Sequence, residues 1–153
     1  MKVRDIMTQD VLTVTAETSV NDVAKLLGQR DIRGVPVVDD QQHVIGIITE
    51  LDLIVRNTRL EMPHFIEVLD WGRIPLERPS HLRERLQHML GTEARDVMTE
   101  KVVTIGPEAS IEELAELMVK QRVNPVPVVD EQGRLIGIVS RADLVDMMAA
   151  QLE

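Results

Sequence analysis

Apolar residues near the N-terminus follow first a helical and then a strand pattern. Apolar side chains recur at i, i+3, i+4 and i+7 from Val20 to Leu27, behind the N-cap residue Ser19, and predict an amphipathic helix that breaks near Gly28. Short apolar runs bounded by turn residues predict strands at 11–14, 35–38 and 44–48, and a further helix starts at Thr49. The predicted order is strand, helix, strand, strand, helix.

The same series of motifs occurs a second time, 91 residues further along the chain. Val-Pro-Val-Val-Asp at 35–39 returns at 126–130, Gly-Ile-Ile-Thr at 46–49 returns as Gly-Ile-Val-Ser at 137–140, and Arg-Asp-Ile-Met-Thr at 4–8 returns as Arg-Asp-Val-Met-Thr at 95–99. The second copy has stronger signals, because Ser110 and Glu113 form a full capping box and Gly133 suits a turn with positive φ. We therefore predict two copies of one β-α-β-β-α unit, the second closing with a helix from about Ser140 towards Leu152.

A segment of different character separates the two copies. It holds the only aromatic residues, Phe65 and Trp71, and helical turns are predicted in it at 64–69 and from Ser80 to Gly91. We expect a helical insertion that packs over the copies or pairs with a second subunit, with a gate over a ligand site as the alternative. The predicted boundaries are residues 1–55 for the first repeat, 56–93 for the insertion and 94–153 for the second repeat.

Composition narrows the function classes. The 26 acidic residues against 17 basic ones give a formal net charge of -9, and the repeats hold no aromatic side chain, so we expect no nucleic-acid partner. The chain has no cysteine, and its four histidines lack metal-ligand spacing. No apolar run is long enough to cross a bilayer, so we expect a soluble cytoplasmic protein. Catalysis is not expected, because no nucleophile elbow or Walker-type loop occurs.

Two matching pairs of polar residues are the candidates for chemistry. Thr49 and Asp52, and likewise Ser140 and Asp143, stand at predicted strand-to-helix junctions. Such a pair can simply cap its own helix. It can also bind a ligand, because the hydroxyl and the free N–H groups of a helix start suit phosphate, and a carboxylate accepts hydrogen bonds from a ribose diol. Glycines at positions 46 and 137 are expected to let the backbone approach that ligand.

Taken together and in this order, these motifs resemble those of a pair of CBS domains, also called a Bateman module. The resemblance covers residues 3 to about 55 and 94 to about 148. It implies a free-standing protein with a mixed α/β (α+β) fold, in which two repeats pack by pseudo-twofold symmetry with a helical insertion between them. It also implies a regulatory module that binds AMP, ADP, ATP or S-adenosylmethionine between the repeats and transmits occupancy to a partner protein. No obligatory cofactor and no metal are implied.

The resemblance assigns ligand roles to residues of both repeats. Asp52 and Asp143 would hold the ribose, Thr49 and Ser140 would face the phosphate, and the residues before each Val-Pro would line the adenine between aliphatic side chains. The expected nucleotide site consists of Ile32, Arg33, Gly34, Thr49, Asp52, Thr104, Val123, Asn124, Pro125, Ser140, Arg141 and Asp143. Thr104 and its counterpart Thr13 are the weaker members of this set.

The two predicted sites differ at one charged position. Arg141 follows Ser140, where a guanidinium can clamp a phosphate, whereas the matching residue of the first repeat is Glu50. We expect the second-repeat site to prefer phosphorylated adenosines. The first-repeat site should take an uncharged or cationic tail, or stay empty, unless Arg33 compensates. The alternative for Arg141 is an ordinary solvated helix residue, and Pro125 is expected to narrow the second adenine slot.

Two function classes stay open at this point. In the first, the chain is an adenosyl-sensing regulatory module. In the second, it is a dimerising interaction module whose nucleotide sites are vestigial. We expect a homodimer in both cases, with the insertion and the apolar residues of the closing helix as candidate contact surfaces. Those residues are Leu144, Val145, Met147 and Met148.

Overall fold

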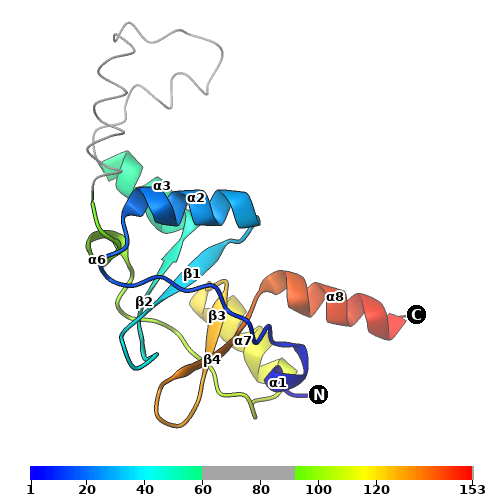
Figure 1. Ribbon diagram of the computed structural model, residues 1–153. Coiled ribbons are helices and arrows are strands. Elements are labelled where there is room, and N and C mark those ends of the chain that lie inside the picture. The colour runs from blue at the N-terminus through cyan, green and yellow to red at the C-terminus, as the bar shows by residue number, and fades with distance from the viewer. Residues whose placement is uncertain (60–91, 153) are drawn as a thin grey trace, which may run out of the picture.

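The computed structural model describes residues 1–59 and 92–152 and has an α+β fold (Figure 1). The predicted insertion, apart from residues 56–59 and 92–93, lies outside the described residues. In chain order the elements are α1 (Val3–Ile6), α2 (Val20–Arg30), β1 (Gly34–Val38), β2 (Val44–Thr49), α3 (Glu50–Arg59), α6 (Ala94–Val97), α7 (Ile111–Gln121), β3 (Val126–Val129), β4 (Leu135–Val139) and α8 (Arg141–Leu152). The duplicated order predicted from the sequence is therefore confirmed for its helices and for the paired strands of each copy.

The equivalent helices α2 and α7 begin and end in the same way. The Ser19 hydroxyl accepts a hydrogen bond from the Asp22 N–H at 3.1 Å, and Ser110 forms the full capping box with Glu113. The helix α2 was expected to break near Gly28, but it does not end there. The helix continues to Arg30 because the next residue takes the left-handed conformation (φ 50°) and closes the last turn with its N–H.

Each repeat contains one antiparallel hairpin, β1 with β2 and β3 with β4. In the first turn the Asp39 carboxylate accepts from the N–H of His43 at 2.9 Å, and this bond holds the pKa of Asp39 below its usual value. The Arg134 N–H lowers the pKa of Asp130 in the same way in the second turn. Gly133 has the expected positive φ of 82°.

The predicted strand at 11–14 is reduced to a single contact. Only Val14 pairs with β1, through a parallel bridge to Val37, and the second repeat repeats this with Ile105 and Val128. The stretch before Val14 cannot run along β1, because it carries the chain across from the other repeat. This crossing is visible as the long blue segment in Figure 1.

The short helices α1 and α6 pack on the opposite repeat from the one that they precede in sequence. Val3 and Arg4 donate backbone hydrogen bonds to the carbonyls of residues 109 and 107, at 2.9 and 3.0 Å. Ala94 and Arg95 donate equivalent bonds to the carbonyls of residues 18 and 16, at 2.7 and 3.0 Å. The two arginines also form ion pairs with the glutamates at 108 and 17 of those repeats. The lead-in segments are thus exchanged between the repeats.

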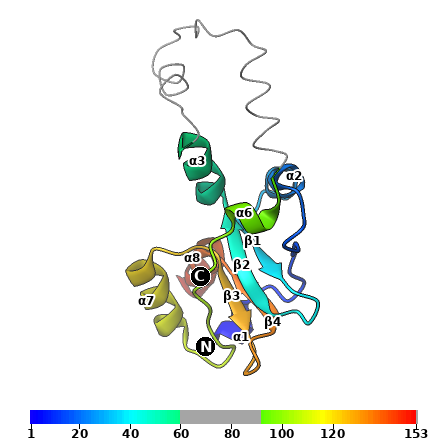
Figure 2. The ribbon, with the colours of Figure 1, turned by 90° about the vertical axis from the view of Figure 1, so that its left-hand side faces the viewer.

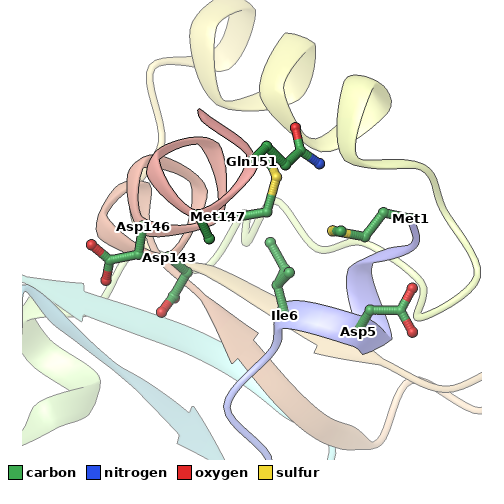
Figure 3. A pocket seen from close by; sticks show the side chains of 8 residues that line it. Met1, Asp5, Ile6, Asp143, Asp146, Met147 and Gln151 are labelled. Atoms are coloured by element: carbon green, nitrogen blue, oxygen red, sulfur yellow. The ribbon is translucent and has the colours of Figure 1, made fainter. Parts of the chain in front are cut away.

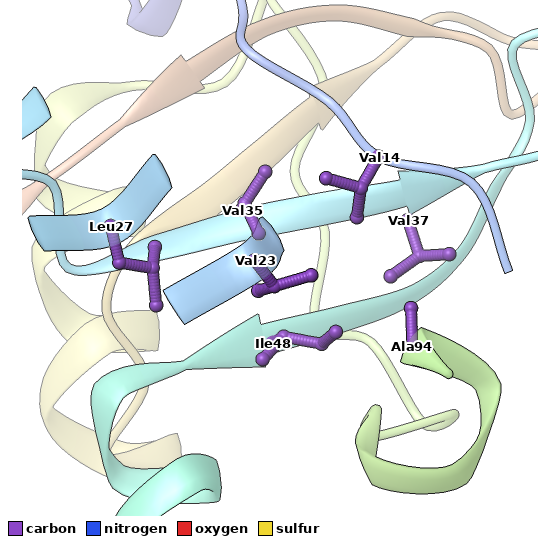
Figure 4. Packing of buried hydrophobic residues seen from close by; sticks show 7 residues of the cluster. All are labelled: Val14, Val23, Leu27, Val35, Val37, Ile48 and Ala94. Atoms are coloured by element: carbon purple, nitrogen blue, oxygen red, sulfur yellow. The ribbon is translucent and has the colours of Figure 1, made fainter. Parts of the chain in front are cut away.

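Two apolar cores result, and each is completed by an exchanged helix. The first core consists of Val14, Val23, Leu27, Val35, Val37, Ile48 and Ala94 (Figure 4). The second consists of Val3, Leu114, Met118, Val126, Val128 and Val139. Val3 and Ala94 are both fully buried. Neither repeat buries its core with its own contiguous stretch of chain.

The two repeats meet at both ends of their hairpins. At the turns, the Leu135 N–H donates to the Gln42 carbonyl at 2.9 Å. At the strand starts, the ring of Pro125 lies where a Cβ of Gly34 would be, since that atom would be 2.7 Å from Pro125 Cδ. Gly34 and Pro125 are equivalent positions of the two repeats, as pseudo-twofold packing requires. Figure 2 shows the two hairpins side by side, with α2, α3 and α6 around the first and α1, α7 and α8 around the second.

Candidate functional site

Almost all of the predicted site residues line one cleft between the two repeats. Its volume is about 1060 Å³. The predicted residues that line it are Ile32, Arg33, Gly34, Thr49, Asp52, Val123, Asn124, Pro125, Ser140, Arg141 and Asp143. Thr104 and Thr13 are not brought to it. The chain is in the cleft at Val102 and Val103 but leaves it by Ile105, where it joins β3.

In the first half of the cleft, Thr49 and Asp52 bind each other at the start of α3. Asp52 Oδ2 accepts from the Thr49 N–H at 2.9 Å and from its hydroxyl at 3.1 Å. The other oxygen, Oδ1, accepts from the hydroxyl of Thr99 at 3.0 Å, on the exchanged lead-in of the second repeat. The interpretation of this pair as a helix cap is confirmed, and both carboxylate oxygens already have a donor.

The charged residues of this half are paired with each other. Arg33 Nη1 lies 3.2 Å from Glu50 Oε2 and 3.3 Å from Oε1. The backbone reinforces the contact, because the Glu50 N–H donates to the Arg33 carbonyl at 3.1 Å. The positive charge of Arg33 is therefore balanced by a carboxylate within the site itself.

The second half of the cleft has the same cap but different surroundings. Asp143 Oδ2 accepts from the Ser140 N–H at 2.6 Å and from its hydroxyl at 2.8 Å. Within residues 1–59 and 92–152, no donor lies on Asp143 Oδ1, so the bond that Thr99 makes to Asp52 has no counterpart here. The Arg141 N–H donates to Asn124 Oδ1 at 2.9 Å, and its guanidinium forms no ion pair in the described part of the chain.

The two glycines that precede the helix starts have a different role from the expected one. A Cβ at Gly46 would lie 2.9 Å from Met98 Cγ, and a Cβ at Gly137 would lie 3.0 Å from Met7 Cγ. The space beside each glycine is filled by the methionine of an exchanged lead-in, so it is not open to a ligand. These glycines permit the close approach of the lead-in, and the expectation that they admit a ligand is corrected.

Sequence reasoning missed the residues that the lead-ins and helix ends bring to the cleft. Thr8 and Thr99 line it, and each exchanges two backbone hydrogen bonds with the β-strand beside it. Three pairs of equivalent residues with opposite charge also line it, namely Asp10 with Lys101, Asp31 with Arg122, and Glu50 with Arg141. Comparison of the copies at the 91-residue offset could have found the first two pairs as well as the third.

A smaller cavity of about 500 Å³ lies between α1 and α8, and Asp143 also lines it (Figure 3). Ile6 of α1 and Met147 of α8 line it, and Asp143 borders both this cavity and the main cleft. Asp143 therefore stands between the ligand cleft and the contact of the closing helix with an exchanged lead-in.

Other kinds of site find little support in the described residues. Over 1–59 and 92–152, no three histidine or acidic side chains are grouped so that they could hold a metal ion. The helices of these ranges include none with the length and apolar character that a bilayer span needs. The cleft offers carboxylates, hydroxyls, helix N–H groups and guanidinium groups.

Comparisons with known proteins agree with this architecture. The family model described as CBS domain matches residues 3–56 and 94–150. Protein MJ1426 of Methanocaldococcus jannaschii is 33% identical over an alignment of 154 positions, which covers 97% of this chain and 91% of that protein. The crystal structure of CBSX2, an Arabidopsis thaliana protein, in complex with AMP has a TM-score of 0.74 at 25% identity and covers 99% of this chain and 98% of its own.

A match to an enzyme covers only part of that enzyme. Inosine-5'-monophosphate dehydrogenase of Methanocaldococcus jannaschii is 27% identical over 144 residues, which are 94% of this chain but 23% of the enzyme. The similarity thus gives no reason to assign the dehydrogenase activity to this chain. The two family matches, one on each copy, show that the chain belongs to the CBS-domain family and is a tandem pair of these domains.

Proposed function

We propose that the chain is a regulatory module that binds an adenosyl ligand of the AMP, ADP, ATP or S-adenosylmethionine type between its repeats. One observation carries this proposal: two hydroxyl-and-aspartate helix starts open into a single cleft of about 1060 Å³. A cleft of this size suits a small molecule. The similarity to CBSX2, whose structure is a complex with AMP, supports the adenosyl class.

The chemistry of each half suits a nucleoside. The aspartate can accept hydrogen bonds from a ribose diol, and the positive dipole end of the helix start favours a phosphate. Ile32 and Val123 are half-buried in the cleft wall and offer aliphatic surface to an adenine. The hydroxyls of Thr49 and Ser140 donate to Asp52 and Asp143 in this structure. Rotation about the bond to each hydroxyl oxygen can turn its hydrogen towards a phosphate instead.

Occupancy can be passed on through the exchanged lead-ins. Thr99 of the second repeat donates to the ribose-binding oxygen proposed in the first, Asp52 Oδ1. A ribose hydroxyl that donates to this oxygen shares or displaces that bond, so ligand binding changes a contact between the repeats. We propose that this change is what a regulated partner protein senses.

We propose that a second copy of this chain packs against the helices that close the two repeats, α3 and α8. Helix α8 has no buried residue, and Val145, Met148 and Leu152 are 62%, 59% and 89% exposed along one side of it. Leu51 and Ile54 of the equivalent helix α3 are also exposed. This apolar surface favours the second candidate function as well, a dimerising interaction module with unused nucleotide sites.

A thermal-shift screen separates the two candidates. The ligands are AMP, ADP, ATP, S-adenosylmethionine, NADH and cyclic di-AMP, each measured at constant protein concentration. A ligand at 100 times its dissociation constant adds about 2.7 kcal/mol of stability, and the midpoint should rise by roughly 5–10 °C for a chain of this size. No shift with any of the six would refute the ligand-binding function and favour the interaction module.

A matched pair of variants ties any shift to the cleft. Asp143→Ala should reduce the response, because it removes a proposed ribose acceptor. Asp146→Ala, one turn further along α8, removes the same charge from an exposed residue that does not line the main cleft and should respond as the wild type does. Equal losses in the two variants would mean that the ligand binds elsewhere.

A further inference from the structure

The two halves of the cleft differ systematically in charge. Four positions correspond at the 91-residue offset around each aspartate, two before the strand and two at the helix start. In the first half they are Asp31, Arg33, Glu50 and Asp52. In the second half they are Arg122, Asn124, Arg141 and Asp143. Three acids and one base therefore surround the first half, whereas two bases and one acid surround the second.

We propose that the second half selects adenosyl ligands that carry a phosphate, whereas the first half takes adenosyl ligands without one. This inference rests on the proposed function and names the ligand class of each half. Arg122 and Arg141 are its specificity-determining residues, together with the Arg33–Glu50 pair. The charge distribution repels a phosphate from one helix start and attracts it to the other.

The contacts within each half strengthen this difference. In the first half, the only guanidinium at the four positions is held 3.2 Å from Glu50, and Asp52 accepts from Thr49 and Thr99 with both oxygens. A phosphate there would lie beside two carboxylates. In the second half, the Arg141 guanidinium makes no ion pair among the described residues, and the helix start is anchored by its N–H on Asn124. The guanidinium can therefore turn to a phosphate without breaking an ion pair.

Two further charges, those of Asp10 and Lys101, line the cleft on the segments that cross between the repeats. Asp10 comes between Thr8, which bonds to the second repeat, and Val14, which bonds to the first, and Lys101 has the mirrored position. They are opposite in sign and equivalent in place, and the proposal rests on the four positions before the strand and at the helix start of each half.

Calorimetric titration of AMP and adenosine against the full chain tests the proposal. AMP affinity should fall about tenfold or more in Asp143→Ala and in Arg141→Glu, the loss expected for a charged hydrogen-bonding partner. It should stay within about threefold of wild type in Asp52→Ala, a margin below that tenfold loss. Adenosine affinity should be unchanged in Arg141→Glu, because adenosine has no phosphate. Lys25→Glu makes the same charge change on an exposed face of α2, away from the cleft, and is the control.

A charge exchange gives the sharpest test. In the double variant Glu50→Arg and Arg141→Glu, AMP should move to the first half. Adding Asp52→Ala should then abolish AMP binding, and adding Asp143→Ala should not. Equal loss of AMP in the single variants Asp52→Ala and Asp143→Ala, or loss of adenosine together with AMP in Arg141→Glu, overturns the proposal while leaving the ligand-binding function intact. Failure of the wild type to bind either compound overturns both.

Discussion

The contact between Gly34 and Pro125 makes the joint between the repeats sensitive to a single methyl group. Gly34 does not have a positive φ, so alanine can adopt its backbone conformation. The new Cβ, however, would lie 2.7 Å from Pro125 Cδ, and 3.2 Å from both Pro125 Cγ and Thr49 Cγ2. Gly34→Ala should therefore destabilise the chain by forcing the two repeats apart.

The size of the effect follows from these distances. Carbon atoms pack best at about 3.5–4.0 Å, so the contact with Cδ is too short by about 1 Å. The proline ring cannot rotate away, and such overpacking costs about 1–3 kcal/mol. Alanine regains about 0.4–1 kcal/mol by restricting the unfolded chain. The net loss should be about 0–2.6 kcal/mol, or up to roughly 10 °C in the unfolding midpoint.

Urea unfolding at fixed protein concentration measures this loss. Gly28→Ala is the matched control, because nothing lies within 4 Å of the Cβ it would add and the site is helical. That variant should gain about 0.5–1 kcal/mol. Gly34→Val should lose more than Gly34→Ala, since it adds two further methyl groups at the joint. If Gly34→Ala proved as stable as Gly28→Ala, the described packing of the repeats would be wrong.

Two further predictions concern the second core and the hairpin turns. Leu114→Ala should cost about 2–5 kcal/mol in urea unfolding, because Leu114 is fully buried. Val119→Ala on the same helix should cost little, because Val119 is 76% exposed. The lowered pKa values of Asp39 and Asp130 mean that their contribution to stability is present above their ordinary value of 3.8 and is lost as the pH falls through the folded values. A variant with asparagine at both positions should therefore lose less stability between pH 7 and pH 3 than the wild type, and an unchanged loss would contradict this assignment.

The local signals in the sequence were sufficient for α2, α3, α7, α8 and the two hairpins, whereas the short helices α1 and α6 were not predicted. Ser19 and Ser110 cap their helices as predicted, and Gly133 takes its positive φ, because these features depend on residues a few positions apart. The helix starts of the site could be predicted for the same reason. Thr49 and Asp52 are adjacent on one turn, so their contact is a property of the local sequence.

The exchanged lead-ins could not be predicted from local patterns. The apolar residues Val3 and Ala94 give no sign of which repeat they pack on, since both repeats offer the same kind of core. The role of Gly46 was misread for this reason, because the neighbour that requires a glycine there is Met98, far along the chain. The bond from Thr99 to Asp52 was missed on the same ground.

The exchange of lead-ins also sets the order in which this chain can complete its fold during synthesis. Lys2 pairs with Glu108, which is 106 residues further on, and the buried Val3 beside it packs against residues of the second repeat. Val3 therefore leaves the ribosome well before the residues of the second repeat that bury it. Such distant contacts slow folding, because a long loop must close before they form. Until that point the first core also lacks Ala94, so a nascent chain that stops after the first repeat exposes an unfinished apolar surface.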